Sequence, residues 1–226
     1  MEKQKRIAAI HDISCFGKCS LTVALPIISA AGIETAVIPT AILSTHTGGF
    51  KGFTSLDLTD EMPKIIDHWN SLDLKFDAIY SGYLGSTQQI DIVCDFLDKF
   101  KGEGTLAIVD PAMADNGKMY ALFDLDFAQE MKKLCMKADI IVPNVTEACF
   151  MLGEEYIPSG YGEDYIADIL HRLAELGPKK IVLTGVQYDY KTVASVSFEK
   201  PGKLEVGGVS RDSTGLGALE EGLISS

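Results

Sequence analysis

Short apolar runs of strand length alternate with amphipathic segments of helix length along most of this chain. The apolar runs that we predict as strands are residues 6–10, 34–39, 76–81, 106–109, 139–142 and 180–183. The segments with apolar residues every three or four positions, which predict helices, are 20–31, 58–72, 87–100, 127–137 and 163–176. Strands that are apolar throughout need cover on both faces. The pattern therefore predicts an α/β fold, with a mostly parallel central sheet between two helical layers.

The periodicity changes after residue 187. Residues 192–198 and 203–206 read as two strands on either side of Lys200-Pro201-Gly202, which predicts an antiparallel hairpin. We find no internal repeat, low-complexity tract or linker in the 226 residues. A chain of this length suits one compact domain, so we expect a single domain over 1–226.

Composition limits the partners that the chain can bind. The formal net charge of −12 disfavours binding to nucleic acid or to an anionic membrane surface. No apolar stretch approaches the ~18 residues of a membrane helix, and the polar N-terminus lacks the shape of a signal peptide. The five cysteines are scattered and odd in number, as expected in a reducing compartment. We therefore expect a cytoplasmic protein that binds a small molecule.

The segments that follow the predicted strands are rich in Gly, Asp, Thr and Asn. In sheets of this kind ligands bind outside the carboxyl ends of the strands, so these segments are where chemistry is expected. They are residues 12–17, 44–50, 81–85, 110–115, 143–147 and 184–185.

Two carboxylates, Asp110 and Glu147, follow predicted strands. Each has an ordinary structural role open to it, because an acidic side chain near a helix start caps it or suits its dipole. As a pair on neighbouring strand ends, they would instead hold a hydrated Mg²⁺ that bridges ATP phosphates. The residues alone leave both readings open.

Two further strand-end features have both a plain and a functional interpretation. Asp12, just after the first predicted strand, either faces a small polar ligand or begins a turn. The segment 44–50 is either a flexible loop or a loop that covers a substrate. His46 lies in it, and we assign it no catalytic role, because a lone loop histidine is more often a simple polar contact.

Taken in order, these segments resemble the pyridoxal kinase family of the ribokinase-like superfamily, in particular its bacterial pyridoxamine-kinase-like branch. The similarity runs from about residue 6 to residue 186 and is carried by 10–17, 43–50, 80–85, 109–115, 142–147 and 182–185. The resemblance implies a ribokinase-like fold and ATP-dependent phosphorylation of the 5′-hydroxymethyl group of pyridoxal, pyridoxine or pyridoxamine. It also implies a homodimer that uses ATP and Mg²⁺, with a monovalent cation as a further candidate.

The resemblance also implies site residues. The substrate-binding residues would be Asp12, Thr47 and Gly48. The nucleotide-binding residues would be Asp110, Asn144, Glu147 and Thr184, with Asp110 and Glu147 as metal ligands.

The chain departs from the family near its C-terminus. The family has a Gly-Thr-Gly-Asp segment there whose aspartate accepts the hydroxyl proton, and Ala218 stands in the place of that aspartate. We therefore assign no catalytic residue, and the C-terminal portion looks incomplete relative to the family. Three explanations are open: a pseudokinase, a fragment or frameshifted product, or a kinase in which Glu220 or Glu221 takes the place of the aspartate. We favour the fragment or frameshifted product.

Alternative functions remain. A hydroxymethylpyrimidine kinase, from the same superfamily, acts on a similarly flat ring that carries a hydroxymethyl group. A non-catalytic protein that holds pyridoxal or a nucleotide is a second alternative, favoured by Ala218. A nicotinamide-dependent oxidoreductase is disfavoured, because no Gly-x-Gly-x-x-Gly turn follows the first strand.

Overall fold

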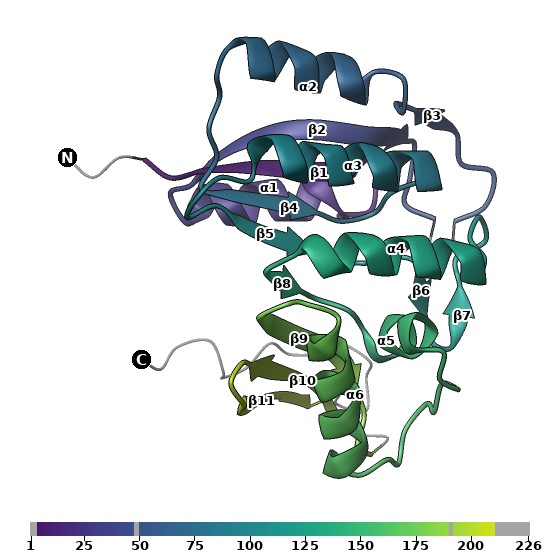
Figure 1. Cartoon of the computed structure of the whole chain (residues 1–226). Helices are drawn as coiled ribbons and strands as arrows, with labels where there is room; N and C mark the ends of the chain where they lie inside the picture. The colour runs from purple at the N-terminus through teal and green to yellow at the C-terminus, as the bar shows by residue number, and fades with distance from the viewer. Residues whose placement is uncertain (1–3, 48–49, 190–191, 211–226) are drawn as a thin grey trace. The chain divides into compact units, whose positions relative to one another are not determined.

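The computed structural model describes residues 4–47, 50–189 and 192–210, and contacts within the chain form two compact units, Met1–Ala112 and Met113–Ser226 (Figure 1). In both units parallel strands are flanked by helices, which confirms the mostly parallel α/β architecture. The expectation of a single domain stays a prediction. Among the described residues no helix is both long enough and apolar enough to cross a membrane.

The sheet of the first unit has β1 near its centre. All neighbouring strands are parallel except β3, which runs antiparallel to β2. β3 was not predicted, because its three exposed residues show no apolar pattern. The strand order is β5 (Leu106–Val109), β4 (Ala78–Ser81), β1 (Arg6–Ser14), β2 (Glu34–Leu43) and β3 (Ser55–Asp57).

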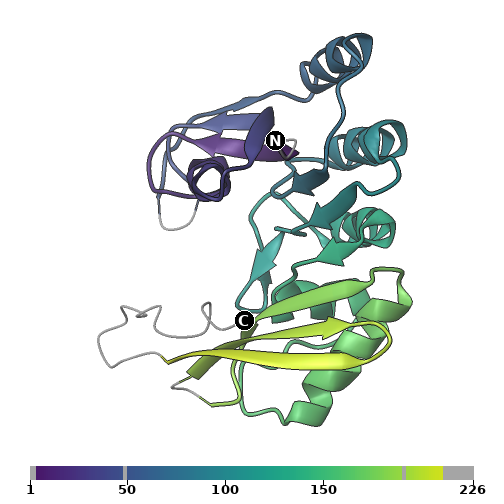
Figure 2. The ribbon, with the colours of Figure 1, turned by 90° about the vertical axis from the view of Figure 1, so that its left-hand side faces the viewer.

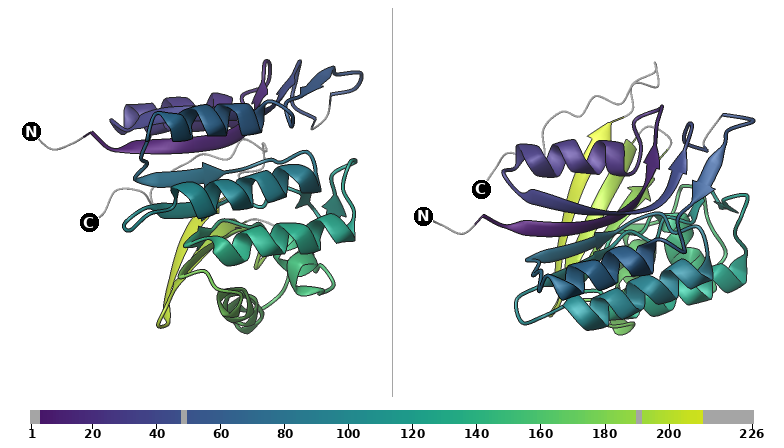
Figure 3. Two further views of the ribbon diagram at one scale, coloured as in Figure 1. Left: turned by 45° about the horizontal axis from the view of Figure 1, so that its top comes forward. Right: turned by 90° about the horizontal axis from the view of Figure 1, so that it is seen from above.

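Helices lie on both faces of this sheet. α1 (Leu21–Ala30) lies on one side of β1 and β2, and α2 (Met62–Ser71) and α3 (Thr87–Phe100) lie on the other (Figures 2 and 3). Alternate residues of β4 and β5 differ in burial, because successive side chains of a strand face opposite sides. Ile79, Ser81, Ala107 and Val109 are buried, whereas Ala78, Tyr80 and Ile108 are half-buried. One face of these two strands is therefore more open than the other.

The helix α3 begins and ends where the sequence predicts. The side chain of Ser86 accepts a hydrogen bond from the Gln89 N–H at 3.3 Å and so caps the helix. The helix buries Ile90, Val93, Phe96, Leu97 and Phe100 along one face. Burial of a large apolar side chain stabilises by about 1.5–3 kcal/mol, so this face contributes more than the cap.

The start of α1 has no side-chain cap. Ser20 does occupy the N-cap position, but its side chain makes no capping hydrogen bond. Its backbone has φ of 52°, outside the extended conformation that directs a serine hydroxyl at the helix start.

β1 extends four residues further than predicted. Its ladder with β2 continues through a bulge, in which His11 pairs with Pro39 and Ile13 pairs with Ile42. His11 and Asp12 are therefore buried residues inside a strand, and the prediction that they follow it is wrong. Their polarity suggested a loop, but pairing with β2 keeps this segment in the strand conformation. Bulges of this kind are frequent beside functional sites, where they re-aim side chains.

The sheet of the second unit confirms the predicted hairpin. β10 (Thr192–Glu199) and β11 (Lys203–Ser210) are antiparallel, and β10 also pairs with β9 (Lys180–Val186), which is parallel to β8 (Ile140–Ile141). A separate small hairpin, β6 (Ala114–Asp115) and β7 (Lys118–Met119), was not predicted. Its turn places Asn116 and Gly117 at φ of 50° and 74°, the conformation that Asn-Gly turns favour.

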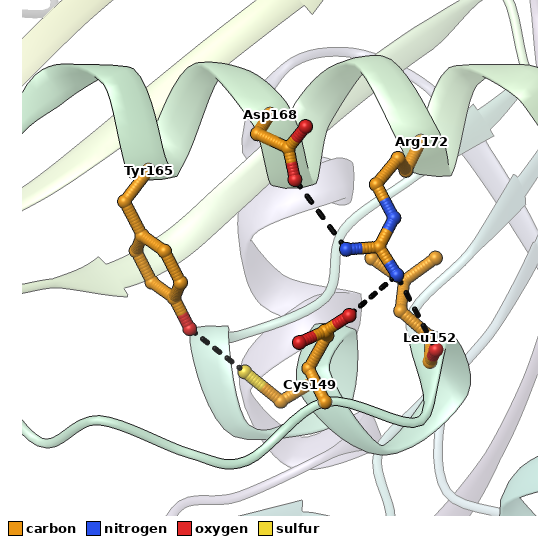
Figure 4. Close-up of polar contacts among 6 residues, drawn as sticks. Cys149, Leu152, Tyr165, Asp168 and Arg172 are labelled. Atoms are coloured by element: carbon orange, nitrogen blue, oxygen red, sulfur yellow. Dashed lines mark hydrogen bonds and ion pairs between the residues drawn. The ribbon is translucent and has the colours of Figure 1, made fainter.

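The helices of the second unit are α4 (Leu125–Lys137), α5 (Val145–Leu152) and α6 (Glu163–Glu175). Polar contacts connect α6 with α5 and the residues just after it (Figure 4). Arg172 binds the Glu154 carboxylate at 2.7 Å and donates to the Leu152 carbonyl at 3.5 Å, while Tyr165 Oη lies 3.5 Å from Cys149 Sγ. Burial raises the pKa of the Cys149 thiol, so we assign this cysteine a structural role.

A buried glutamine connects three segments of the first unit. Gln89 Oε1 accepts from the Gly85 N–H at 2.8 Å, and Gln89 Nε2 donates to the Thr40 carbonyl at 3.0 Å and to Thr59 Oγ1 at 2.9 Å. The side chain thereby holds the segment after β4 against β2 and the segment just before α2.

We predict that Gln89→Ala lowers the free energy of unfolding by about 3 kcal/mol, because it leaves three buried partners without their hydrogen bonds. Urea denaturation checks the change, with Gln88→Ala as the matched control, since Gln88 is exposed on the same helix. Equal stability of the two variants would contradict this role.

Candidate functional site

Buried and half-buried polar side chains lie in and just after β1, β4 and β5, near the carboxyl ends of these strands. We call His11, Asp12, Tyr80, Ser81 and Asp110 the strand-end cluster. Among the described residues, His11 Nε2, Asp12 Oδ1 and Ser81 Oγ are buried without a hydrogen-bond partner. An unsatisfied buried polar group costs about 1–3 kcal/mol, so such atoms indicate a ligand or an ordered water that completes them.

Asp12 has one carboxylate oxygen occupied and one available. It is 3% exposed, and its Oδ2 accepts from Ser14 Oγ at 3.0 Å. Burial, and then the charges of Asp12 and Asp57, raise the pKa of the Tyr83 phenol, which places Tyr83 near Asp12. The structure thus presents Asp12 as a buried acceptor at the edge where ligands bind in such sheets. Its substrate-binding role stays a prediction.

The imidazole of His11 lies across the neighbouring strand. Its ring is 4.4 Å from the Tyr80 ring, in an edge arrangement, and burial lowers the pKa of His11 to about 4. The imidazole is therefore uncharged at neutral pH. A Cβ at Gly82 would lie 2.4 Å from His11 Nδ1, so only glycine at position 82 leaves room for the ring.

Asp110 follows β5, and its N–H donates to the Ser81 carbonyl at 2.9 Å. Burial raises the pKa of its carboxyl to about 6. The pKa of Tyr80 is raised to about 12 by burial and by the charge of Asp110, so these two side chains are neighbours. A buried carboxyl whose charge is poorly compensated suits a cation such as Mg²⁺. The described residues contain no group of three or more candidate ligands, so such an ion would need water or a bound ligand as well.

Three predicted nucleotide-binding residues meet in the second unit. Asn144 caps α5, with its Oδ1 accepting from the Glu147 N–H at 2.9 Å, and it pairs with Thr184 in an isolated bridge. The Thr184 N–H donates to the Pro143 carbonyl at 2.9 Å.

Glu147 is buried and bound to backbone amides. Its Oε2 accepts from the Asn144 N–H at 2.8 Å, and its Oε1 accepts from the N–H groups of Met113 at 3.1 Å and Ala114 at 3.4 Å. The expected structural role at the helix start is confirmed as a capping box. Its metal-binding role stays a prediction.

The loop after β2 carries the remaining predicted substrate residues. Thr47 is exposed, and Gly48 lies outside the described residues. The loop is joined to the turn after β1, where the His46 N–H donates to the Phe16 carbonyl at 3.2 Å. The His46 ring fills the space beside Gly17, whose φ is 97°. Ala218, Glu220 and Glu221 also lie outside the described residues, so the structure leaves the question of the proton acceptor open.

A surface depression of about 220 Å³ lies at the other end of the first unit's strands, lined by Gln4, Arg6, Asp73, Leu74, Lys75 and Asp77. Charged side chains there pair with each other, as in the contacts of Lys5 with Asp77 at 3.1 Å and Lys75 with Asp73 at 2.7 Å. The strand-end cluster is the better candidate, because three of its polar atoms are buried and have no hydrogen-bond partner among the described residues.

Sequence reasoning gave no role to three residues that the structure brings to attention, Thr45, Tyr80 and Ser81. Thr45 Oγ1 and Ser81 Oγ are buried and unpartnered, and Tyr80 lies between His11 and Asp110. The available signal was strand register: residues at equivalent positions of neighbouring parallel strands share a face. That signal becomes usable only when the strand order is known.

Comparison with known proteins identifies similar chains. A family model described as phosphomethylpyrimidine kinase matches residues 24–209. A crystal structure from Bacteroides thetaiotaomicron, assigned as a phosphomethylpyrimidine kinase and containing pyridoxal, is 40% identical with a TM-score of 0.89 and covers 92% of this chain and 73% of that one. The pyridoxal kinase of Lactobacillus plantarum is 31% identical with a TM-score of 0.79, over 92% of this chain and 73% of that one.

A curated relative is a longer enzyme. The chloroplastic thiamine biosynthetic bifunctional enzyme TH1 of Arabidopsis thaliana is 24% identical over 167 residues, or 71% of this chain. The chain spans 30% of the length of that relative.

We predict that Asp110→Asn becomes more stable relative to the unmodified protein as pH rises from about 4 to about 6. The folded pKa of about 6 lies above the ordinary 3.8, so in this window the folded state keeps a proton that the unfolded chain releases. The stabilising contribution of the carboxyl is full below about pH 4 and is lost as pH rises through 6, a change of about 3 kcal/mol.

Urea denaturation of both proteins across this pH range tests the effect. The depressed pKa of His11 acts in the opposite direction, since its contribution is lost as pH falls towards 4, but it cancels in the difference between the two proteins. Asp60→Asn, at an exposed position, is the matched control. A difference that stays constant with pH would contradict the assignment.

Proposed function

Since the chain belongs to the phosphomethylpyrimidine kinase family, we propose that it binds ATP and a flat heteroaromatic ring that carries a hydroxymethyl group. The reaction of this site is transfer of the γ-phosphoryl group of ATP to that hydroxymethyl group. Pyridoxal, pyridoxine and pyridoxamine are the leading substrates. The choice of pyridoxal is supported by its presence in the 40% identical protein from Bacteroides thetaiotaomicron.

The observation that carries the proposal is the unpartnered Oδ1 of Asp12. It is a buried carboxylate oxygen at the carboxyl end of a central parallel strand, with its other oxygen already bound to Ser14. A hydroxyl on a ligand ring would donate to it and so fix the orientation of the ring. Because water has little access, this bond is strong and directional. Thr47 and Gly48 are proposed to cover the ring from the loop after β2.

Asp110 is the proposed Mg²⁺ ligand of the first unit, with Glu147 as the further metal ligand implied by the family resemblance. Bound Mg²⁺ offsets the charge of the ATP phosphates. Asn144 and Thr184, which pair with each other, are proposed to bind the nucleotide. Thr184 and Asn144 would contribute a hydroxyl and amide groups as hydrogen-bond partners, while Asp110 contributes the compensating negative charge for the cation.

Turnover also needs a group that accepts the hydroxyl proton. Ala218 stands where the family resemblance places an aspartate. We therefore propose as a second candidate that this chain binds its ligands without phosphorylating them. The cytoplasmic location and the homodimer expected from the resemblance belong to the same proposal.

A third candidate is hydroxymethylpyrimidine as the ring substrate. It is supported by the description of the family model and by the thiamine biosynthetic relative. Both rings are flat and carry a hydroxymethyl group, so a hydrogen bond to Asp12 does not by itself distinguish the two substrates.

We predict that Ala218→Asp phosphorylates pyridoxal at least about 100-fold faster than the unmodified chain, because a positioned general base contributes about 10²–10⁴-fold. Asp12→Asn in that background should weaken pyridoxal binding about tenfold, through loss of a charge-assisted hydrogen bond. Product formation from pyridoxal and ATP, with calorimetric titration of pyridoxal, measures both.

The matched control is Asp91→Asn, an exposed position on α3, which should change neither quantity. Rapid phosphorylation by the unmodified chain would show that another group replaces the aspartate. Phosphorylation of hydroxymethylpyrimidine but not of pyridoxal would favour the third candidate. Absence of binding to either ring would contradict the proposed function.

A further inference from the structure

His11, Gly82 and Asp110 form one row across three strands. β1 pairs with β4 at Ile10 and Ser81, and β4 pairs with β5 at Ser81 and Val109. The next residue of each strand therefore stands in the following row, and the ladder continues there through hydrogen bonds from the Gly82 N–H to the Ile10 carbonyl at 3.0 Å and from the Asp110 N–H to the Ser81 carbonyl at 2.9 Å. Equivalent positions in parallel strands face the same side.

The middle position of this row has no side chain. Gly82 is buried, and the imidazole of His11 fills the space that a Cβ would take, 2.4 Å from Nδ1 and 2.5 Å from Cε1. The ring therefore extends over β4, the strand that separates His11 from Asp110. Tyr80 lies on the same face, with its ring against His11 and its phenol within the electrostatic reach of Asp110.

The far nitrogen of this imidazole has no partner. His11 is 3% exposed, and Nε2 is buried without a hydrogen bond among the described residues. If this position served packing alone, a leucine would fill it as well, without the cost of desolvating a polar atom. An imidazole held here by a glycine and a tyrosine, with one nitrogen unsatisfied, indicates a polar group of a ligand as the missing partner.

The chemistry of Asp110 identifies that group. A cation at this carboxylate finds too few protein ligands among the described residues and must take oxygens from water or from a bound ligand. For Mg²⁺ those oxygens include phosphate oxygens, so a phosphate group comes to the row that His11 shares. A neutral N–H donates a hydrogen bond to a phosphate oxygen without repelling the cation. The ammonium group of a lysine would repel it.

We propose that His11 donates a hydrogen bond from Nε2–H to a phosphate oxygen of the magnesium nucleotide bound beside Asp110. The inference rests on the proposed function and adds a nucleotide-binding residue directly before Asp12 in β1. It makes His11 a determinant of nucleotide affinity, while Asp12 determines affinity for the ring.

Calorimetric titration with Mg²⁺–ADP and thermal denaturation without ligand test the proposal. His11→Leu is expected to weaken Mg²⁺–ADP about tenfold or more, the usual effect of losing a hydrogen bond to a charged group. Pyridoxal affinity should stay within about twofold, because Asp12 is intact. The Tm of the free protein should stay equal or rise, because an unsatisfied buried polar atom is removed.

Two further variants sharpen the test. His11→Gln keeps an uncharged N–H donor and should retain most of the nucleotide affinity. His68→Leu makes the same change at an exposed helix position and should alter neither affinity.

Unchanged Mg²⁺–ADP affinity in His11→Leu would overturn the inference and leave an ordered water as the partner of Nε2. A lower Tm or a failure to fold would also overturn it, because the protein itself would then depend on the imidazole. If the unmodified chain binds no Mg²⁺–ADP, the proposed function fails and this inference with it. If the unmodified chain binds Mg²⁺–ADP and His11→Leu binds it equally well, the inference about His11 is refuted and the proposed function stands.

Discussion

The pairing of β1 with β2 and β4 is the interaction on which the candidate site depends. Both edges of β1 are hydrogen-bonded to parallel neighbours, and most of its side chains are buried. The ladder with β2 continues as far as Ser14, beyond the point where the side chains of β1 become polar, whereas the pairing with β4 ends at Ile10. His11 and Asp12 are thus buried inside the strand with part of their side-chain hydrogen-bonding capacity unused. A ligand is the natural partner for what remains.

Sequence patterns predicted the elements whose signal is local. The apolar face of α3, the turn of the β10–β11 hairpin and the acid at the start of α5 are each visible in a few residues. The end of β1 and the short β3 were missed because their strand conformation comes from pairing with β2, which local polarity does not reveal. In these segments, pairing with β2 imposes a strand conformation that the local sequence does not favour.

The same distinction applies to the site. Asp12 and Asp110 could be proposed from position alone, because polar residues at the ends of apolar strands mark the ligand edge of a parallel sheet. The packing of the His11 ring beside Gly82 could not be predicted from the sequence, since it depends on the register of two strands and on the direction of a side chain. Glu147 illustrates the opposite case. Its sequence context by itself favoured an acid at a helix start, with a metal ligand as the alternative, and the structure shows its carboxylate bound to three backbone amides.

A crystal structure of the chain soaked with pyridoxal tests the central claim most directly, namely that the unpartnered Oδ1 of Asp12 in β1 binds a ring ligand. The account predicts a ring hydroxyl within about 2.6–3.0 Å of Asp12 Oδ1, the ordinary range of such a hydrogen bond. Pyridoxal bound elsewhere, for example in the depression beside Arg6 and Asp77, with Asp12 Oδ1 still unpartnered, would contradict it.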